Sequence, residues 1–387
     1  MNILFLMKGY AVGGIEVVTA TLASCFARHG HKVVIATFEA PEALTVARTD
    51  DSVKIYTLGD YKCTNQNIVA LRNILIEHQI QVVINQWGLP FVSCRVLNKA
   101  KKGLKVKTIA VYHNQVDTNA RIKNVEIALE SCVNPLKRSL LKLKKAAFKF
   151  VTSRSMAYVY HHTDIYQVLS PSYIPLFSKF TGINHPNHLM VQTNPVTLES
   201  SDFSYSFDKK EKEIIYMGRI DYNQKRVYRV IDTWAKLEAQ FPDWRLTIVG
   251  DGVERKNVEQ QVADYGLHHV KFEGFQQPKP YYKRASILLL TSEYEGFPLV
   301  LTESMSFGVI PVVYNSYSAV GDIIDDGENG LVIPYHKEGY RADEAAKMLA
   351  NLINDTTMRD VMATAAIEKS KEYSVERIYE QWMETLK

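Results

Sequence analysis

The stretch that decides the fold lies in the second half of the chain and reads Thr291-Ser292-Glu293-Tyr294-Glu295-Gly296-Phe297-Pro298-Leu299-Val300-Leu301-Thr302-Glu303. The apolar run at residues 287–290 precedes it and predicts a buried strand. A glycine loop follows, then a helix with Pro298 near its first turn and Gly308 at its end. Because residues 310–314 are again apolar, the segment predicts a βαβ unit.

The same alternation of short apolar runs and longer amphipathic segments continues through all 387 residues. Strands that alternate with helices form parallel sheets, so we predict an α/β fold. The strands are expected at residues 3–7, 32–37, 82–85, 108–113 and 166–169 of the first half, and at 213–217, 245–249, 270–273, 287–290 and 310–314 of the second.

Two domains and a terminal helix are expected. The stretch between Pro195 and Lys212 is polar, serine-rich and aperiodic, and is typical of a linker. It separates residues 1–195 from residues 196–371. In residues 372–387, Ser374 is a candidate N-cap before apolar residues at helical spacing, which predicts a helix that packs on the first domain.

Composition excludes several classes of protein. The chain is 46% hydrophobic and 23% charged, as soluble globular proteins are. Its four cysteines are scattered and form no C-x-x-C pair, which disfavours a zinc site and fits a reducing compartment. The first apolar run stops at Lys8, too early for a signal peptide, and no run is long enough to span a bilayer. We therefore expect a cytoplasmic protein.

Charge is divided unevenly between the halves. Residues 1–195 hold 23 Lys and Arg against 11 Asp and Glu, and the remainder holds 23 against 31. An anionic partner is expected for the first half. No nucleic-acid-binding motif accompanies the charge, so we expect no nucleic acid partner.

The basic residues concentrate in residues 99–149, and two interpretations of this window remain open. Within it, Leu136, Leu140, Leu143, Ala147 and Phe150 recur at helical spacing, with lysines between them. One interpretation is an amphipathic helix on an anionic membrane, near a lipid-linked acceptor, which would make the protein peripheral on the inner face. The other is a helix with its apolar face on the core and its lysines in water.

A glycine loop follows the first strand and reads Gly9-Tyr10-Ala11-Val12-Gly13-Gly14. A helix-like run begins at Ile15, so the loop offers backbone N–H groups to a phosphate. Tight turns often use the same residues. The loop matches neither the P-loop nor G-x-G-x-x-G, which disfavours a nicotinamide oxidoreductase.

The second half carries the sharper set of residues. Gly218-Arg219 follows the strand at 213–217, and Lys225 lies six residues on. Two cations at the carboxyl end of a parallel strand suit a diphosphate. Farther on, Glu295 precedes the helix and Glu303 lies within it, where carboxylates could accept hydrogen bonds from sugar hydroxyls.

Taken together, these motifs resemble those of retaining glycosyltransferases of family 4, which have the GT-B fold. The resemblance rests on Gly13-Gly14-Ile15-Glu16, Asn194-Pro195-Val196, Gly218-Arg219 with Lys225, Val249-Gly250-Asp251-Gly252, and Glu295-Gly296-Phe297-Pro298 with Glu303. It implies two Rossmann-like domains with parallel sheets facing an interdomain cleft. The first domain would bind the acceptor and the second the donor.

The resemblance also implies roles for single residues. Arg219 and Lys225 would hold the donor diphosphate, Glu295 would contact the transferred sugar, and His113 would lie near the reacting centre. Glu303 would bind the donor ribose. The donor would also be met by the backbone of Gly296, Phe297, Leu299 and Val300, by Gly250, by Gly274 and Phe275 beside the nucleobase, and by Gly13 and Gly14 of the first domain.

We therefore expect a glycosyltransferase that moves a hexose-type sugar from a nucleotide diphosphate sugar to a glycan or lipid-linked acceptor. The product would belong to a cell-surface polysaccharide or glycolipid. No D-x-D pair is present, so we expect no metal and no cofactor, with a UDP-sugar as the default donor. The alternatives are a decayed GT-B binding protein and a GT-B epimerase or phosphorylase.

Three departures from the family pattern leave the acceptor undefined. Arg226 follows Lys225 where the family usually has glycine. Ser304 stands where alanine is common, and Asn85-Gln86-Trp87-Gly88 occupies a place where a histidine is frequent.

Overall fold

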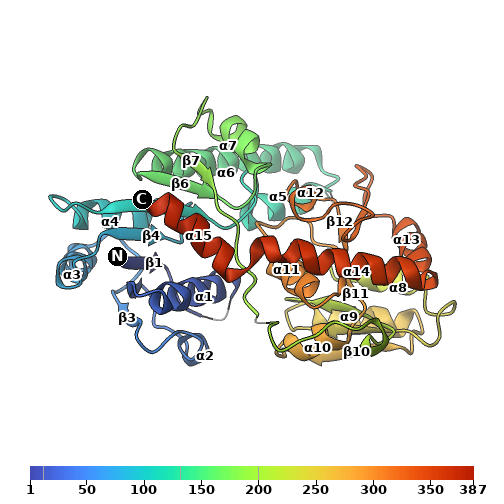
Figure 1. Cartoon of the computed structure of the whole chain (residues 1–387). Coiled ribbons are helices and arrows are strands. Elements are labelled where there is room, and N and C mark those ends of the chain that lie inside the picture. Colours follow the sequence, from blue (N-terminus) through green and yellow to red (C-terminus); the bar gives the residue numbers. More distant parts are fainter. Residues whose placement is uncertain (12, 131, 199) are drawn as a thin grey trace. The chain divides into compact units, whose positions relative to one another are not determined.

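The computed structural model describes residues 1–11, 13–130, 132–198 and 200–387 (Figure 1). The chain folds into two compact units. Unit 1 comprises Met1–Thr197 and Ser374–Lys387, and unit 2 comprises Leu198–Tyr373. Val12 of the glycine loop and Glu199 of the expected linker lie outside the described residues.

Unit 1 is built on a parallel sheet of seven strands in the order β3-β2-β1-β4-β5-β6-β7. Its strands are β1 (Asn2–Met7), β2 (Lys32–Thr37), β3 (Lys54–Thr57), β4 (Val82–Asn85), β5 (Lys107–Tyr112), β6 (Ile165–Val168) and β7 (Leu189–Val191). Its helices are α1 (Gly14–Arg28), α2 (Ala43–Val46), α3 (Asn65–Glu77), α4 (Phe91–Ala100), α5 (Ala120–Glu130), α6 (Pro135–His161), α7 (Tyr173–Thr181) and α15 (Val375–Leu386).

Alternate residues of the central strands point to opposite faces of this sheet, as strand geometry requires. Leu4 and Leu6 of β1 join a buried cluster with side chains of α3 and α4. Phe5, between them, stacks on Phe26 of α1 with ring centroids 6.0 Å apart. Because both faces are covered, β1 is an uninterrupted apolar run rather than an alternating one.

The C-terminal helix α15 returns to unit 1 and packs beside α1 (Figure 1). Ser374 caps it by accepting a hydrogen bond from the Arg377 amide at 3.4 Å. Trp382 meets Phe26 edge to face at 6.3 Å, and Lys107 Nζ donates to the Thr385 carbonyl at 2.8 Å. The last segment of the chain therefore completes the core of the first unit.

Unit 2 has a parallel sheet of six strands in the order β10-β9-β8-β11-β12-β13. Its strands are β8 (Glu213–Met217), β9 (Arg245–Val249), β10 (Val270–Gly274), β11 (Ile287–Leu290), β12 (Ile310–Tyr314) and β13 (Leu331–Ile333). Its α-helices are α8 (Tyr228–Trp234), α9 (Arg255–Asp264), α10 (Lys279–Arg284), α11 (Leu299–Ser306), α12 (Val320–Ile323), α13 (Ala342–Asn354) and α14 (Thr356–Ser370). Two short 3₁₀ helices span Phe207–Lys209 and Lys371–Tyr373.

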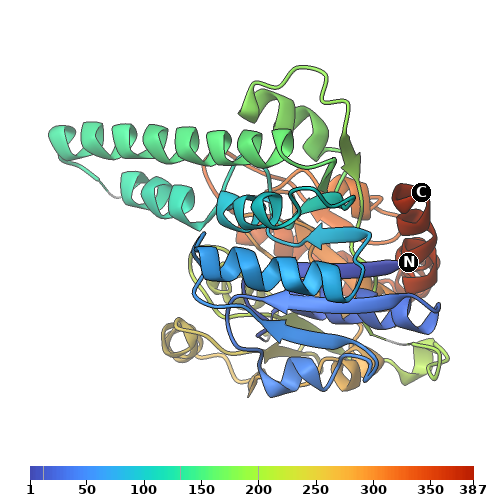
Figure 2. The ribbon, with the colours of Figure 1, turned by 90° about the vertical axis from the view of Figure 1, so that its left-hand side faces the viewer.

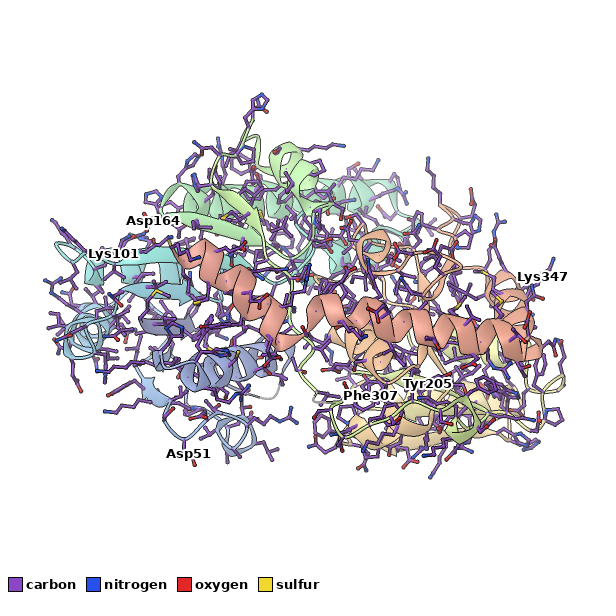
Figure 3. All side chains as sticks on the ribbon, in the orientation of Figure 1. Asp51, Lys101, Asp164, Tyr205, Phe307 and Lys347 are labelled. Atoms are coloured by element: carbon purple, nitrogen blue, oxygen red, sulfur yellow. The ribbon has the colours of Figure 1, made fainter. Side chains whose placement is uncertain are left out.

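The polar stretch that was expected to link the domains packs against unit 2 over much of its length. Phe203 lies 5.2 Å from the ring of Phe307, and the Tyr205 hydroxyl donates to Asp360 at 3.0 Å. Figure 3 shows Tyr205 beside Phe307. The aromatic side chains of this serine-rich segment pack it against the surface of unit 2. The polarity of the segment alone does not predict this packing.

The predicted α/β fold with two parallel sheets is confirmed. All ten predicted strands form, six of them with the predicted bounds. The three strands that the sequence did not indicate, β3, β7 and β13, each lie at the edge of a sheet. No helix in the described part of the chain is both long and apolar enough to span a bilayer.

Candidate active site

The strands β8 and β11 are neighbours in the sheet of unit 2, and the strand order reverses between them. In doubly wound sheets this switch point is where ligands bind, beyond the carboxyl ends of the strands. Gly218 and Arg219 follow β8, and the segment from Thr291 to Glu295 follows β11. The two most distinctive motifs of the second half are therefore brought to one edge of one sheet.

The central contact of this edge joins Lys225 to Glu295. Lys225 Nζ lies 2.6 Å from Glu295 Oε1, and the two side chains are only 16% and 8% exposed. Gln224 Nε2 donates to the other carboxylate oxygen, Oε2, at 3.2 Å. Burial strengthens a charge-assisted pair of this kind and makes the removal of either partner costly.

Arg219 belongs to the same network but reaches toward solvent. Its Nε donates to Asp221 Oδ2 at 2.8 Å, and its Nη2 donates to Gln224 Oε1 at 3.1 Å. The side chain is 64% exposed, so the guanidinium keeps a face for another anion. Gln224 therefore bridges Arg219 and Glu295.

Asp221 shapes the loop that carries both cations. Its Oδ1 accepts hydrogen bonds from the amides of Gln224 at 2.7 Å and Lys225 at 3.1 Å. Burial raises the pKa of this carboxyl, but the two amides and the Arg219 guanidinium outweigh it and lower the pKa below its ordinary value. Asp221 therefore stays ionised and holds the loop at neutral pH.

Three adjacent strands of unit 2 end in a glycine with positive φ. These are Gly218 after β8 (φ 148°), Gly250 after β9 (φ 141°) and Gly274 at the end of β10 (φ 69°). A Cβ on Gly250 would lie 1.9 Å from the Gly218 carbonyl oxygen. A glycine is needed at position 250 because the backbones of Gly218 and Gly250 approach closely. This approach packs the loop of Arg219 against the end of β9.

Helix α11 positions the remaining donor-side residues. Glu303 is buried, and the Tyr282 hydroxyl donates to its Oε2 at 3.4 Å. The Phe297 ring packs on Tyr373 at 5.3 Å in the core, so Phe297 could meet a ligand only through its backbone. Gly296 is buried, and Leu299 and Val300 are half-buried at the start of α11. By contrast, the Phe275 ring is 61% exposed and free to stack.

The expected residues of unit 1 lie at the carboxyl edge of its own sheet. Gly13 precedes α1 as its N-cap with extended backbone, and Gly14 is the first residue of that helix. His113 directly follows β5, and its Nε2 donates to Gln86 Oε1 at 2.6 Å. Gln86 follows β4, in the segment where the family often has a histidine. His113 therefore has an amide partner from the neighbouring strand.

His113 is expected to make stability depend on pH. Burial lowers its pKa to about 3. Between the unfolded value of about 6.5 and about 3, the unfolded chain binds a proton that the folded chain does not, so stability is lost as pH falls through this range. A His113→Gln variant keeps an amide nitrogen near the position of Nε2 and cannot titrate.

The free energy of unfolding of the wild type should fall relative to that of His113→Gln by about 2 kcal/mol between pH 7 and pH 5. Urea denaturation of the two proteins at both pH values measures this difference. Equal changes in the two proteins would show that His113 is accessible to protons in the folded state.

Several residues of this site were not predicted from the sequence. They are Asp221, Gln224, Arg226, Arg229 and Glu293. Arg229 Nη2 donates to Glu293 Oε2 at 2.9 Å, directly behind the Lys225 segment. The spacing of Asp221 three and four residues before Gln224 and Lys225 is the signal of an Asx-type turn, and it could have identified the first of them.

Arg226 explains one departure from the family pattern. Its φ is 53°, a left-handed conformation that favours glycine. The side chain is nevertheless buried, with its guanidinium 4.7 Å from the ring of Tyr222 and its Nη1 3.2 Å from the Tyr228 hydroxyl. These aromatic contacts hold a residue type that the backbone geometry disfavours.

Within the described ranges, which omit only residues 12, 131 and 199, no cluster of three or more His, Cys, Asp or Glu side chains is arranged to hold a metal ion. Two of the cations at the switch point, Arg219 and Lys225, are each paired with a carboxylate of the same unit.

Comparison with known proteins identifies the family of the chain. Residues 12–175 match the family described as Glycosyltransferase Family 4, and residues 199–369 match Glycosyl transferases group 1. The chain is a GT-B glycosyltransferase of the family 4 kind. It depends on a nucleotide sugar, and its relatives are glycosyltransferases of polysaccharide, lipopolysaccharide and glycolipid synthesis.

Two curated relatives align with this glycosyltransferase along its whole length. One is the GalNAc-alpha-(1->4)-GalNAc-alpha-(1->3)-diNAcBac-PP-undecaprenol alpha-1,4-N-acetyl-D-galactosaminyltransferase of Campylobacter jejuni, 25% identical over 100% of this chain and 98% of the relative. The other is the amylovoran biosynthesis glycosyltransferase AmsD of Erwinia amylovora, 22% identical over 100% and 99%. Among solved structures, Anabaena HepE in complex with UDP superposes with a TM-score of 0.76 at 18% identity, covering 100% and 99% of the two chains.

Proposed function

We propose that this glycosyltransferase moves a hexose-type sugar from a UDP-sugar to a lipid-linked glycan during synthesis of a cell-surface polysaccharide or glycolipid. The buried Lys225–Glu295 pair at the switch point of unit 2 carries the proposal. The Campylobacter relative, whose name specifies an undecaprenol diphosphate-linked acceptor, supports a lipid-linked acceptor. The structural neighbour that binds UDP supports the choice of nucleotide.

The reaction breaks the bond between the anomeric carbon and the diphosphate, and the leaving nucleotide takes the electron pair. Negative charge therefore grows on a phosphate oxygen, where preorganised cations stabilise the transition state most. Lys225 would supply one cation and the exposed Arg219 fork the other. The amides at the start of α11 would add hydrogen bonds and the positive end of the helix dipole.

Donor binding would change the partner of Lys225. With a diphosphate present, Lys225 Nζ would turn toward a phosphate oxygen, and Glu295 would accept a hydroxyl of the transferred sugar. The carboxylate would still be hydrogen-bonded by Gln224, so neither charge would be left buried alone. Glu303, oriented by the Tyr282 hydroxyl, would bind the ribose, and Phe275 would border the base.

Two features of the proposal derive from the family resemblance and from the charge of the site. The proposal that the anomeric configuration is retained rests on the resemblance alone. NMR measurement of the anomeric proton coupling in the product tests it. Catalysis without a divalent metal rests on the two cations, which supply the positive charge that a metal gives elsewhere. The protein groups themselves would then neutralise the leaving diphosphate.

A thermal-shift screen against nucleotide sugars is the direct test. A donor at 100 times its dissociation constant should stabilise the protein by about 2.7 kcal/mol. The upward shift in Tm should be largest for a UDP-sugar, should persist in EDTA, and should shrink in Arg219→Ala. If no nucleotide sugar moves the Tm, donor binding is refuted. If EDTA abolishes transfer, the metal-free mechanism is refuted.

Product analysis separates the alternative activities. Transfer should require an acceptor, such as a short undecaprenyl diphosphate-linked glycan analogue. An epimerised donor or a sugar phosphate formed without an acceptor would indicate an epimerase or phosphorylase. Donor binding with neither transfer nor hydrolysis would indicate a binding protein.

A further inference from the structure

The long helix α6 presents an exposed apolar stripe. Leu136, Leu140 and Leu143 are 83%, 67% and 68% exposed, and Phe150 is 63% exposed. The spacings of four, three and seven residues place all four side chains on one face of the helix. At 1.5 Å per residue the stripe is about 21 Å long. These leucines therefore do not pack into the core of unit 1.

The opposite face of α6 is occupied by α5. Lys145 of α6 lies 2.8 Å from Glu126 of α5, and Leu141 and Phe148 on this side are half-buried. Arg138 Nη1 donates to the Leu129 carbonyl at the end of α5, which ties the two helices together. Figure 2 shows α5 and the first half of α6 extending beyond the sheet of unit 1. The α5–α6 arm is therefore a supported pair of helices with one bare face.

Lysines border the stripe on both sides. Helical periodicity places Lys137 and Lys144 along one flank, and Lys142 and Lys149 along the other; Lys149 is half-buried and the other three are exposed. A central apolar stripe between two rows of long cationic side chains is the pattern of helices that lie in a membrane interface, where lysines reach outward to the headgroups.

From this arrangement we infer that the stripe of α6 docks on an anionic lipid bilayer. Charge decides between the possible occupants. In a symmetric contact between two copies of this chain, the lysine rows would face the same rows of the partner and repel them. Anionic headgroups instead attract every lysine while the leucines and Phe150 enter the acyl boundary. The docking goes beyond the proposed reaction and does not depend on donor chemistry.

Vesicle co-sedimentation of the full chain tests the docking. The probes are vesicles of phosphatidylcholine alone and vesicles that also contain phosphatidylglycerol. The wild-type protein should sediment with the vesicles that contain phosphatidylglycerol and should remain in the supernatant with phosphatidylcholine alone. The binding should weaken as the salt concentration rises. Binding to neither kind, or equally to both, would overturn the proposal.

Two sets of variants assign the effect to the stripe and to its lysines. The first set combines Leu136→Ser, Leu140→Ser and Leu143→Ser, and the second combines Lys137→Gln, Lys142→Gln, Lys144→Gln and Lys149→Gln. Each should lower vesicle affinity by at least about tenfold. Six of the seven changed side chains are exposed and Lys149 is half-buried, so folding should be preserved, and an unchanged Tm checks it.

Matched controls make the corresponding aliphatic-to-serine and lysine-to-glutamine changes at exposed positions elsewhere. They are Leu44→Ser, Val69→Ser and Ile76→Ser for the apolar set, and Lys54→Gln, Lys179→Gln, Lys256→Gln and Lys347→Gln for the charged set. Vesicle binding should persist in both controls, and a loss there equal to that in the α6 variants would overturn the assignment. A dimer that the leucine variants dissociate, with no vesicle binding by the wild type, would identify the stripe as an interface between copies.

Turnover with a water-soluble acceptor should be the same in all of these proteins. Failure of vesicle binding with normal turnover would therefore leave the proposed function intact. Failure of turnover with normal vesicle binding would leave the docking surface intact.

Discussion

Replacing Lys225 with methionine is expected to lower kcat by roughly 10²- to 10³-fold. Methionine preserves much of the volume of the side chain but removes the cation that would face the leaving diphosphate. Loss of one preorganised group that stabilises transition-state charge typically costs this much. Steady-state transfer kinetics with a UDP-sugar measure the effect, and the loss should appear mainly in kcat.

Stability has to be separated from catalysis in this variant. Lys225→Met leaves the Glu295 carboxylate buried without its cation, which costs about 3–5 kcal/mol. The double variant Lys225→Met with Glu295→Gln removes that charge and should regain much of the stability. It should not regain activity, because the cation is still missing.

Lys347→Met is the matched control for Lys225→Met, since Lys347 is exposed on α13 (Figure 3). It should leave both stability and kcat unchanged. Near-normal turnover in Lys225→Met would show that this lysine is structural and would remove the main support for the proposed mechanism.

The second large effect is expected from Gly250→Ala. The new methyl group would lie 1.9 Å from the Gly218 carbonyl oxygen, and φ at this position is 141°, which L residues rarely adopt. Backbone atoms cannot yield as a flexible side chain would. The free energy of unfolding should fall by about 3 kcal/mol or more, with the midpoint of urea denaturation measuring it.

Gly321→Ala provides the matched control. Gly321 lies in α12, where an added Cβ meets no atom within 4 Å. Alanine is the better helix former by about 0.5–1 kcal/mol, so this variant should be neutral or more stable. Equal and small effects of the two substitutions would mean that the loops after β8 and β9 do not approach as closely as described.

Activity of Gly250→Ala should fall as well, because the loop that it displaces carries Arg219. A protein that is destabilised yet fully active at low temperature would show that the donor site does not depend on this packing.

The central strands were predictable because burial on both faces makes each of them an uninterrupted apolar run. β2, β4, β8, β9, β11 and β12 have the bounds that their sequence indicates. Three of the four edge strands, β3, β7 and β13, were not predicted, since an edge strand has a neighbour on one side only. β3 is partly exposed along its length and contains Lys54 and Thr57, and β7 and β13 are three residues each. Short runs of this kind do not stand out from loops.

The residues of the candidate site were predictable as a set, because motifs after parallel strands gather at one edge of the sheet. The contacts between individual residues of the set were not predictable. The contact between Lys225 and Glu295 spans seventy residues of sequence, and it exists only because β8 and β11 are neighbours. The same holds for His113 and Gln86, which meet because β4 and β5 are adjacent.

Helix α6 separates what the local sequence pattern determines from what tertiary packing determines. The spacing of its leucines and lysines determines an amphipathic helix, because side-chain direction along a helix depends only on position in the sequence. Which face is covered depends on what packs there. α5 takes the side of Leu141 and Phe148, held by Lys145 and Glu126, and leaves the leucine stripe in solvent. Periodicity describes one element, whereas burial is a property of two elements in contact, and only the folded chain brings them together.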